Sequence, residues 1–243
     1  MWNVKNRWCL ITGASRGVGR EIAGRMASLG ANLILQSRSR KHSEETASLV
    51  RIRGVQAISV ECDLDSPESI RAMLTEIDAT GQNIDIVFNN AGRMSRYFSD
   101  YTGNTLEDFR EAMAVNFFAP IQIAYHFLPK MIRNGCGRML LTTSGIADEP
   151  ELAAYACAKA ALSKFVQDFA CKLNGTNVMM NLMDPGWLRT DLGGPNAPND
   201  VSTVVPGALV GNLLDDGKSG RLFRAQDYVG MTLEEALKLA AEK

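Results

Sequence analysis

Short apolar segments alternate with amphipathic segments along most of the chain, and this alternation constrains the fold more than any other feature. The apolar segments have the length of buried β-strands, and the amphipathic segments have the apolar spacing of helices that cover a sheet. We predict strands at 7–12, 31–37, 55–63, 83–92, 137–145 and 176–186, and helices at 19–30, 43–54, 66–77, 105–132 and 151–173. Strands and helices in this order form a parallel sheet that is covered on both faces.

The predicted fold class is therefore α/β, with a single doubly wound parallel sheet of the Rossmann type and helices on both faces. The length of 243 residues suits one domain, residues 1–243. Ser66 is the expected N-cap of the third helix, with Pro67 in its first position, and a bend is expected near Pro120 in the fourth helix. The segment 191–206 contains three prolines, two glycines and two asparagines, so we expect a long loop there.

Composition narrows the range of partners. The net charge of −1 gives no general attraction to nucleic acid or to an anionic membrane. No window approaches the roughly 20 apolar residues of a membrane span, and no apolar signal core precedes the first strand. The five cysteines form no CxxC pair, which argues against disulfides and zinc and favours a reducing, cytoplasmic location. His42 and His126 have no partner at a ligand spacing, so we expect no metal site.

A glycine-rich turn, TGASRGVG at 12–19, joins the first strand to the first helix. In a parallel sheet, ligands bind at the carboxyl ends of the strands, which is where this turn lies. Gly13, Gly17 and Gly19 would permit a tight turn and a close approach of the backbone to a pyrophosphate. The alternative is an ordinary strand-to-helix turn of small residues.

The end of the second strand indicates which dinucleotide the chain prefers. NAD-binding folds usually place a carboxylate about 20 residues after the glycines, yet no acidic residue occurs between Glu21 and Glu44. Arg38 follows the strand instead, and Arg16 lies in the glycine turn, so we expect NADP(H), whose 2′-phosphate suits a guanidinium. The alternative is a solvated basic loop. Asp63, after the third strand, would either accept a bond from adenine or cap the next turn.

Tyr155 and Lys159, in the sequence YACAK, lie one turn apart on one predicted helix. A free phenol has a pKa near 10, and a neighbouring ammonium is expected to lower that pKa. Ser144 closes the strand before this helix and would hydrogen-bond a substrate carbonyl oxygen, with Thr142 or Thr143 as alternatives.

Taken together, these motifs resemble the short-chain dehydrogenase/reductase family over residues 7 to about 191. The resemblance rests on TGASRGVG, CDL (62–64), NNAG (89–92), Asn116 in AVNFFAP, Ser144 with YACAK, and DPGWLRT (184–190). It implies hydride transfer between nicotinamide and a carbonyl or alcohol carbon of a small-molecule substrate.

The resemblance also implies roles for single residues. Tyr155 would give a proton to the substrate oxygen, Ser144 would polarise that oxygen, Lys159 would lower the phenol pKa and bind the nicotinamide ribose, and Asn116 would hold a water. The implied cofactor-binding set is Gly13, Ser15, Arg16, Gly17, Val18, Gly19, Ser37, Arg38, Ser39, Asp63, Leu64, Asn90, Ala91, Gly92, Tyr155, Lys159, Pro185, Gly186, Trp187 and Thr190.

The expected activity is that of an NADP(H)-dependent ketone or aldehyde reductase, for example a 3-oxoacyl thioester reductase. Alternatives are a non-catalytic NADP(H) sensor or scaffold on the same fold, or an epimerase or dehydratase. The helices at 105–132 and 151–173 resemble the pair through which the family forms homodimers and homotetramers. The family's C-terminal strand ending in Asp-Gly-Gly is expected to be missing, and an atypical segment, 219–243, with a short terminal helix, takes its place.

Overall fold

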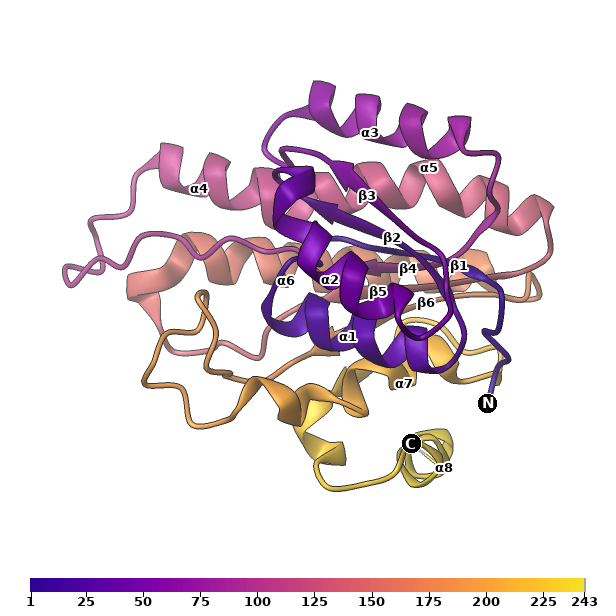
Figure 1. Ribbon diagram of the computed structural model, residues 1–243. Helices are drawn as coiled ribbons and strands as arrows, with labels where there is room; N and C mark the ends of the chain where they lie inside the picture. Colours follow the sequence, from indigo (N-terminus) through magenta and orange to yellow (C-terminus); the bar gives the residue numbers. More distant parts are fainter. Residues whose placement is uncertain (243) are drawn as a thin grey trace.

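The computed structural model describes residues 1–242, whose seven strands form one parallel sheet (Figure 1). The strand order is β3-β2-β1-β4-β5-β6-β7, so the order reverses between β1 and β4. The strands are β1 (Trp8–Ile11), β2 (Asn32–Ser37), β3 (Ala57–Glu61), β4 (Ile84–Asn89), β5 (Gly137–Thr142), β6 (Val178–Asp184) and β7 (Leu222–Arg224). The predicted fold class and all six predicted strands are confirmed, although β5 ends at Thr142 rather than at 145.

The helices lie between these strands in the chain. They are α1 (Gly17–Ser28), α2 (Arg40–Arg51), α3 (Pro67–Ala79), α4 (Leu106–Met113), α5 (Ala119–Arg133), α6 (Ala153–Phe169), α7 (Gly207–Leu213) and α8 (Leu233–Glu242). Short 3₁₀ turns occupy Pro150–Leu152, Ala170–Leu173, Val201–Val204 and Ala225–Tyr228. The predicted cap of α3 is confirmed, because the Ser66 hydroxyl accepts the N–H of Ser69 over 3.1 Å.

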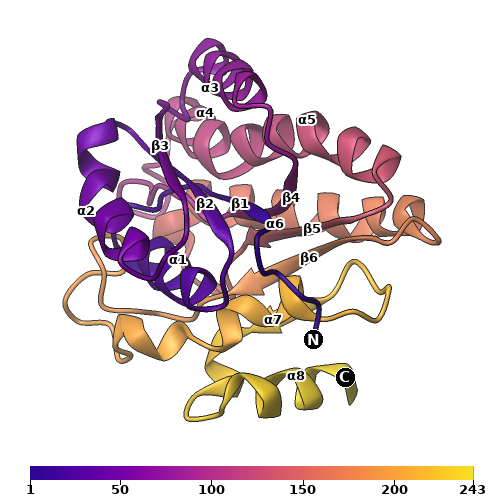
Figure 2. The same cartoon turned by 45° about the vertical axis from the view of Figure 1, so that its right-hand side comes forward.

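Both faces of the sheet are apolar, because successive apolar residues of each strand point to opposite faces. In β1, Trp8 and Leu10 pack under α3, α5 and α6, while Cys9 and Ile11 pack under α1, α7 and α8. Figures 1 and 2 show these two helical layers on either side of the sheet. This arrangement explains why the strands are continuous apolar runs instead of alternating ones.

The long helix predicted at 105–132 is interrupted by a π-helical turn at Ala114–Phe118, and the expected bend at Pro120 is replaced by this turn. Proline has no N–H, so Pro120 cannot donate to the carbonyl of Asn116, four residues earlier. A wider turn before the proline accommodates that missing bond, and π-turns of this kind occur often at functional sites. Asn116 lies inside the turn and is 1% exposed.

The C-terminal strand predicted to be missing is present, so that expectation is wrong. Strand β7 pairs in parallel with β6, with Leu222 opposite Leu182, although no Asp-Gly-Gly follows it. Only Phe223 of its three residues is buried, which leaves no periodic pattern for sequence analysis to detect. Helix α7 also escaped prediction; its residues are all buried, so it lacks an amphipathic pattern. The short terminal helix is confirmed as α8.

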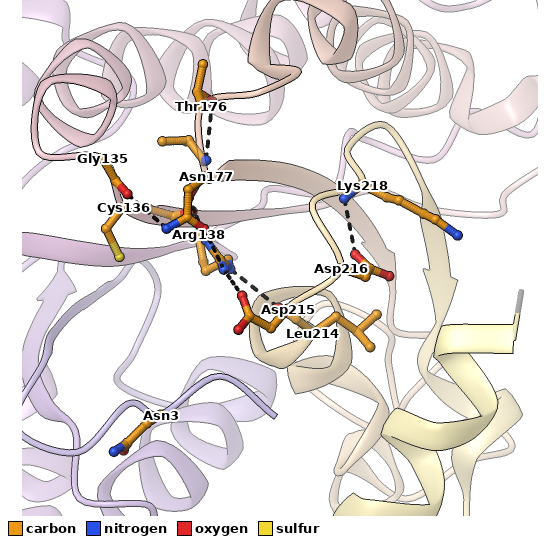
Figure 3. Close-up of polar contacts among 12 residues, drawn as sticks. Asn3, Gly135, Cys136, Arg138, Thr176, Asn177, Leu214, Asp215, Asp216 and Lys218 are labelled. Atoms are coloured by element: carbon orange, nitrogen blue, oxygen red, sulfur yellow. Dashed lines mark hydrogen bonds and ion pairs between the residues drawn. The ribbon is translucent and has the colours of Figure 1, made fainter.

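A buried arginine organises the amino edge of the sheet, opposite the candidate site (Figure 3). Arg138, at the start of β5, donates to the carbonyl of Asn177 over 2.8 Å and to the carboxylate of Asp215 over 2.6 Å. Its guanidinium also stacks on the ring of Trp2 at 4.4 Å. These contacts compensate for the burial of a charge and hold the first residues of the chain against the sheet.

Candidate active site

The strand ends at the reversal of strand order are joined by side-chain hydrogen bonds. The hydroxyl of Thr12 accepts the N–H groups of Asn90 and Ala91, each over 3.0 Å, and the Asn90 amide donates to the Thr12 carbonyl over 3.0 Å. Gln36 donates to the carbonyl of Cys62 over 2.8 Å and accepts the N–H of Gly13 over 3.0 Å. The ends of β1, β2, β3 and β4 are thereby fixed around the glycine turn.

The backbone geometry requires glycine at the three predicted positions of this turn, for two different reasons. Gly13 and Gly17 have φ values of +65° and +56°, which favour glycine. A Cβ at Gly19 would clash with the carbonyl oxygen of Gly13, so α1 begins directly against the turn. The first turn of α1 has no acidic residue, and Arg16 at its N-cap makes no side-chain capping bond. The free N–H groups and helix dipole at this end fit a pyrophosphate.

The residues after β2 differ in how far their charges are already paired. Ser37 is buried and its hydroxyl donates to the carbonyl of Ser39 over 2.6 Å. Arg40 is occupied by Glu76 and by the carbonyl of Ser59. Arg38 is exposed, and its guanidinium has no hydrogen bond or ion pair with any other residue of 1–242. Among these residues, Arg38 is therefore the arginine available to a ligand.

After β3, the alternative prediction that Asp63 caps the next turn is supported. One Asp63 carboxylate oxygen accepts the N–H of Asp65 over 3.1 Å, while the backbone N–H of Asp63 donates to the Ser69 hydroxyl over 2.9 Å. The side chain is exposed, and the neighbouring Leu64 is buried. The cap uses only one carboxylate oxygen, so it is compatible with a bond from the second oxygen to a ligand.

Helix α6 brings Tyr155 and Lys159 together, with Lys159 Nζ 5.8 Å from the centroid of the Tyr155 ring. Both side chains are buried, and the Ser144 hydroxyl lies close enough to the Tyr155 phenol to lower its pKa. Thr143 is turned away, because its hydroxyl bonds to Ser163 at 2.7 Å and to the carbonyl of Lys159 at 3.2 Å. Of the candidate hydroxyls, Ser144 is the one beside the phenol.

The expected lowering of the Tyr155 pKa is wrong for this structure. Burial raises the pKa of Tyr155 to about 12; the nearby Ser144 hydroxyl lowers it, and the charge of Asp184 raises it further. Lys159 instead donates to the carbonyl of Thr142 over 2.7 Å, and burial lowers its own pKa to about 8. Desolvation is the largest cause of both shifts, because both groups lie out of water.

Asn116 holds the chain that follows β4. Its amide donates to the carbonyls of Arg93 and Ala112 over 2.8 and 2.9 Å, and its oxygen accepts the N–H of Arg93 over 3.1 Å. A Cβ at Gly92 would lie 3.2 Å from this oxygen and 3.6 Å from Lys159 Nζ. The π-turn thus places Asn116 and Gly92 beside Lys159.

The segment after β6 folds over the glycine turn. Pro185 is held by the amide of Gln226, which donates to its carbonyl over 2.9 Å, and Gly186 has a φ of +77°. Thr190 contacts the position of a Gly17 Cβ at 3.5 Å, and Arg16 forms an ion pair with Asp191 over 2.6 Å. Trp187 is 58% exposed, with its indole N–H bonded to the carbonyl of Gly193.

The structure therefore gathers the predicted motifs at one edge, and it adds residues that sequence reasoning missed. Thr12, Gln36, Asp184 and Gln226 each bond a predicted site segment. Thr12 and Asp184 stand inside quoted motifs, but nothing in their spacing reveals a contact with another strand.

None of the helices within 1–242 has both the length and the apolar character needed to span a membrane. That part of the chain also lacks any group of three or more His, Cys, Asp and Glu placed to bind a metal.

The model of the family described as short chain dehydrogenase matches residues 7–200. The chain belongs to this family. The family assignment made from the motifs is confirmed, and it places the chain among oxidoreductases.

Curated members of the short-chain dehydrogenase family resemble the chain along most of its length. A fatty acyl-CoA reductase of Acinetobacter baylyi is 32% identical over 206 residues, 84% of this chain and 69% of that protein. A 3-oxoacyl-(acyl-carrier-protein) reductase of Aquifex aeolicus is 33% identical over 186 residues, 75% of this chain and 74% of that protein. The 7alpha-hydroxysteroid dehydrogenase of Escherichia coli is 30% identical over 226 residues, which are 92% of this chain and 84% of that protein.

Solved structures of the family share the fold. A metagenomic short-chain oxidoreductase in complex with NADP has a TM-score of 0.77 and 28% identity, over 92% of this chain and 99% of that one. An NAD⁺-bound xylitol dehydrogenase has a TM-score of 0.81 and 23% identity, over 92% of this chain and 98% of that one. At this level of identity the likeness shows the fold alone.

Proposed function

We propose that the protein is an NADP(H)-dependent oxidoreductase that interconverts a carbonyl and an alcohol, acting as a ketone or aldehyde reductase. The observation that carries the proposal is the buried Tyr155 phenol, which has the half-buried Ser144 hydroxyl beside it and lies one helical turn from Lys159. A proton donor and an oxygen-binding hydroxyl beside a dinucleotide turn are the groups that carbonyl reduction requires.

Tyr155 is the proton donor. With a pKa of about 12 the phenol keeps its proton at neutral pH, so it is ready to protonate a substrate oxygen. Ser144 orients and polarises that oxygen through its hydroxyl. A bound NADPH supplies the hydride that completes the reduction.

Lys159 and Asn116 restore the proton. The Lys159 amine, with a pKa of about 8, exchanges protons near neutral pH, and it stands between Tyr155 and the Gly92–Asn116 contact. Lys159 also binds the nicotinamide ribose in this proposal. Asn116 keeps the Arg93 backbone in place, so that a water beside the lysine has a fixed path to solvent.

The preference for NADP(H) rests on Arg38. Its free guanidinium follows β2, and no carboxylate stands at the end of that strand. The relative solved with NADP supports this preference. The remaining cofactor contacts are proposed for the glycine turn, Asp63, Asn90 to Gly92, and Pro185 to Thr190.

The proposed substrates include 3-oxoacyl thioesters, which the names of two curated relatives suggest. The segment 191–206, whose only regular turn is Val201–Val204, is the proposed substrate loop. No observation favours the non-catalytic sensor, since Asn116, Ser144, Tyr155 and Lys159 are all present and assembled.

The test measures oxidation of NADPH and of NADH with ketones, aldehydes, quinones and 3-oxoacyl thioesters, for the wild type and Tyr155→Phe. We expect turnover that prefers NADPH, and a drop of about 100- to 10,000-fold in the variant with NADPH binding retained. Tyr125→Phe, an exposed tyrosine on α5, is the matched control. Equal turnover by Tyr155→Phe would remove Tyr155 from the mechanism.

A further inference from the structure

Asp184, the last residue of β6, is a buried carboxylate with a free oxygen. The side chain is 8% exposed, and one of its oxygens accepts the N–H of Gly186 over 2.9 Å. Within residues 1–242, no lysine, arginine or histidine forms an ion pair with it, and its second oxygen, Oδ2, has no hydrogen-bond donor. Burying a carboxylate without a cation is unfavourable, so this oxygen is suited to a partner that arrives with a ligand.

The free oxygen faces the reacting groups. Strands β5 and β6 pair with Thr142 opposite Met183, so the residues after β5 lie beside Asp184. A Cβ at Gly145 would lie only 2.7 Å from Oδ2, and Gly145 directly follows Ser144. The charge of Asp184 also acts on Tyr155. Oδ2 is therefore adjacent to the place where the substrate oxygen would meet Ser144 and Tyr155.

A purely structural role would need only the first oxygen. The bond to Gly186 shapes the turn at Pro185, and a neutral amide would make that bond equally well. The charge and the second oxygen have no function in that turn. The absence of a side chain at Gly145 leaves space beside Oδ2, as a ligand group requires.

We propose that Asp184 forms a substrate subsite that binds a hydroxyl or cationic group on the carbon next to the reacting carbonyl. This inference rests on the proposed reductase function and adds ketones with an α-hydroxyl or α-ammonium group to its proposed substrates. A hydroxyl would donate its hydrogen bond to Oδ2, and a cation would neutralise the buried carboxylate. A carboxylate or phosphate at the same position would be repelled, so the site selects against anionic ketones.

The test uses two pairs of phenyl ketones that differ only in the group beside the carbonyl. α-Hydroxyacetophenone against propiophenone tests the hydrogen bond, and phenacyltrimethylammonium against neopentyl phenyl ketone tests the charge at constant shape. We expect kcat/KM to favour the hydroxyl or cationic member of a pair by about tenfold or more, as for a hydrogen bond to a charged group. Asp184→Asn keeps the Gly186 bond and should lower both ratios by about tenfold, since any intrinsic difference in carbonyl reactivity remains in the variant.

Asp168→Asn is the matched control, because it removes an exposed carboxylate from the surface of α6 and should leave the ratios unchanged. Wild-type ratios near one in both pairs would overturn the proposal whatever the variant does, including a variant that fails to fold. A wild type that reduces none of the four ketones would count against the proposed function on these substrates and not against the subsite. In that case calorimetry with the NADP⁺ complex decides: tighter binding of the cation than of its neutral isostere supports Asp184, and equal binding overturns it.

Discussion

The Nζ atom of Lys159 donates to the carbonyl oxygen of Thr142 over 2.7 Å, which ties the middle of α6 to the end of β5. Lys159 is 3% exposed, and within residues 1–242 it has no acidic partner. A neutral carbonyl satisfies one N–H but does not compensate for the burial of a positive charge. This is why burial lowers the pKa of Lys159 to about 8 from the ordinary value of 10.5.

Lys159→Met should change how stability depends on pH. Between pH 8 and 10.5 the unfolded chain keeps the lysine proton and the folded protein has lost it, so Lys159 makes the wild type more stable as pH rises. The stability difference, wild type minus Lys159→Met, should rise by on the order of 1–2 kcal/mol from about pH 8 to about pH 9.5. Denaturant unfolding of both proteins measures it, and a constant difference would contradict the burial argument. Above pH 10 the raised pKa of Tyr155 makes the folded protein less stable as pH rises, so the comparison is made below pH 10.

Ser144→Ala and Thr143→Ala should fail in different ways. Ser144→Ala removes the hydroxyl beside Tyr155, so we expect turnover to fall by about 100-fold or more with little change in unfolding free energy. Thr143→Ala removes bonds to Ser163 and Lys159, so stability should fall by about 1–2 kcal/mol. Cofactor oxidation and chemical denaturation of both variants separate the roles. The reverse result would make Thr143 the oxygen-binding residue.

Arg38→Ala should weaken NADPH binding and leave NADH binding nearly unchanged. The guanidinium has no other partner within 1–242, and a charged bond to a 2′-phosphate is worth about 10- to 100-fold in affinity. Arg40→Ala is the control, since Arg40 is already paired with Glu76. Fluorescence titration gives the four dissociation constants. An equal loss for both cofactors would show that Arg38 does not read the 2′-phosphate.

Two glycines of α1 should respond in opposite ways to alanine. Gly19→Ala places a methyl group against the carbonyl of Gly13, so it should destabilise the turn and abolish NADPH binding. Gly24→Ala, on the same helix, meets only the end of Arg53 at 4.0 Å and should stabilise the protein by about 0.5–1 kcal/mol. Thermal unfolding with and without NADPH tests both. Normal binding by Gly19→Ala would argue against close packing in this turn.

We expect a homodimer or homotetramer that forms through the aromatic side chains of α5 and α6, of which Tyr125 is exposed and Phe165 and Phe169 are half-buried. Tyr125 is 56% exposed and its ring lies 5.8 Å from that of Phe165 and 6.1 Å from that of Phe169. Exposed apolar clusters of this kind often mark interfaces. Sedimentation at micromolar concentration should give at least a dimer, and Tyr125→Asp should shift it toward the monomer. A monomeric wild type would refute the interface.

Much of the fold was contained in local sequence. The first six strands are short apolar segments and most of the helices are amphipathic, so both are recognised from local sequence, and the glycine turn, YACAK and NNAG mark the expected ligand edge because strand ends meet there. Prediction failed where the pattern is short or uniform. Strand β7 buries only Phe223, and α7 is buried on every side, so neither has a period.

The sequence by itself determined the doubly wound sheet, the family and the candidate residues of the site, because these depend on residue type and spacing along the chain. Only the tertiary structure decided which groups meet. It turned Ser144 toward Tyr155 and Thr143 away, engaged Arg40 but not Arg38, and left one oxygen of Asp184 free beside Gly145. It also reversed the expected direction of the Tyr155 pKa, because desolvation is set by the neighbours that folding assembles and not by spacing on a helix.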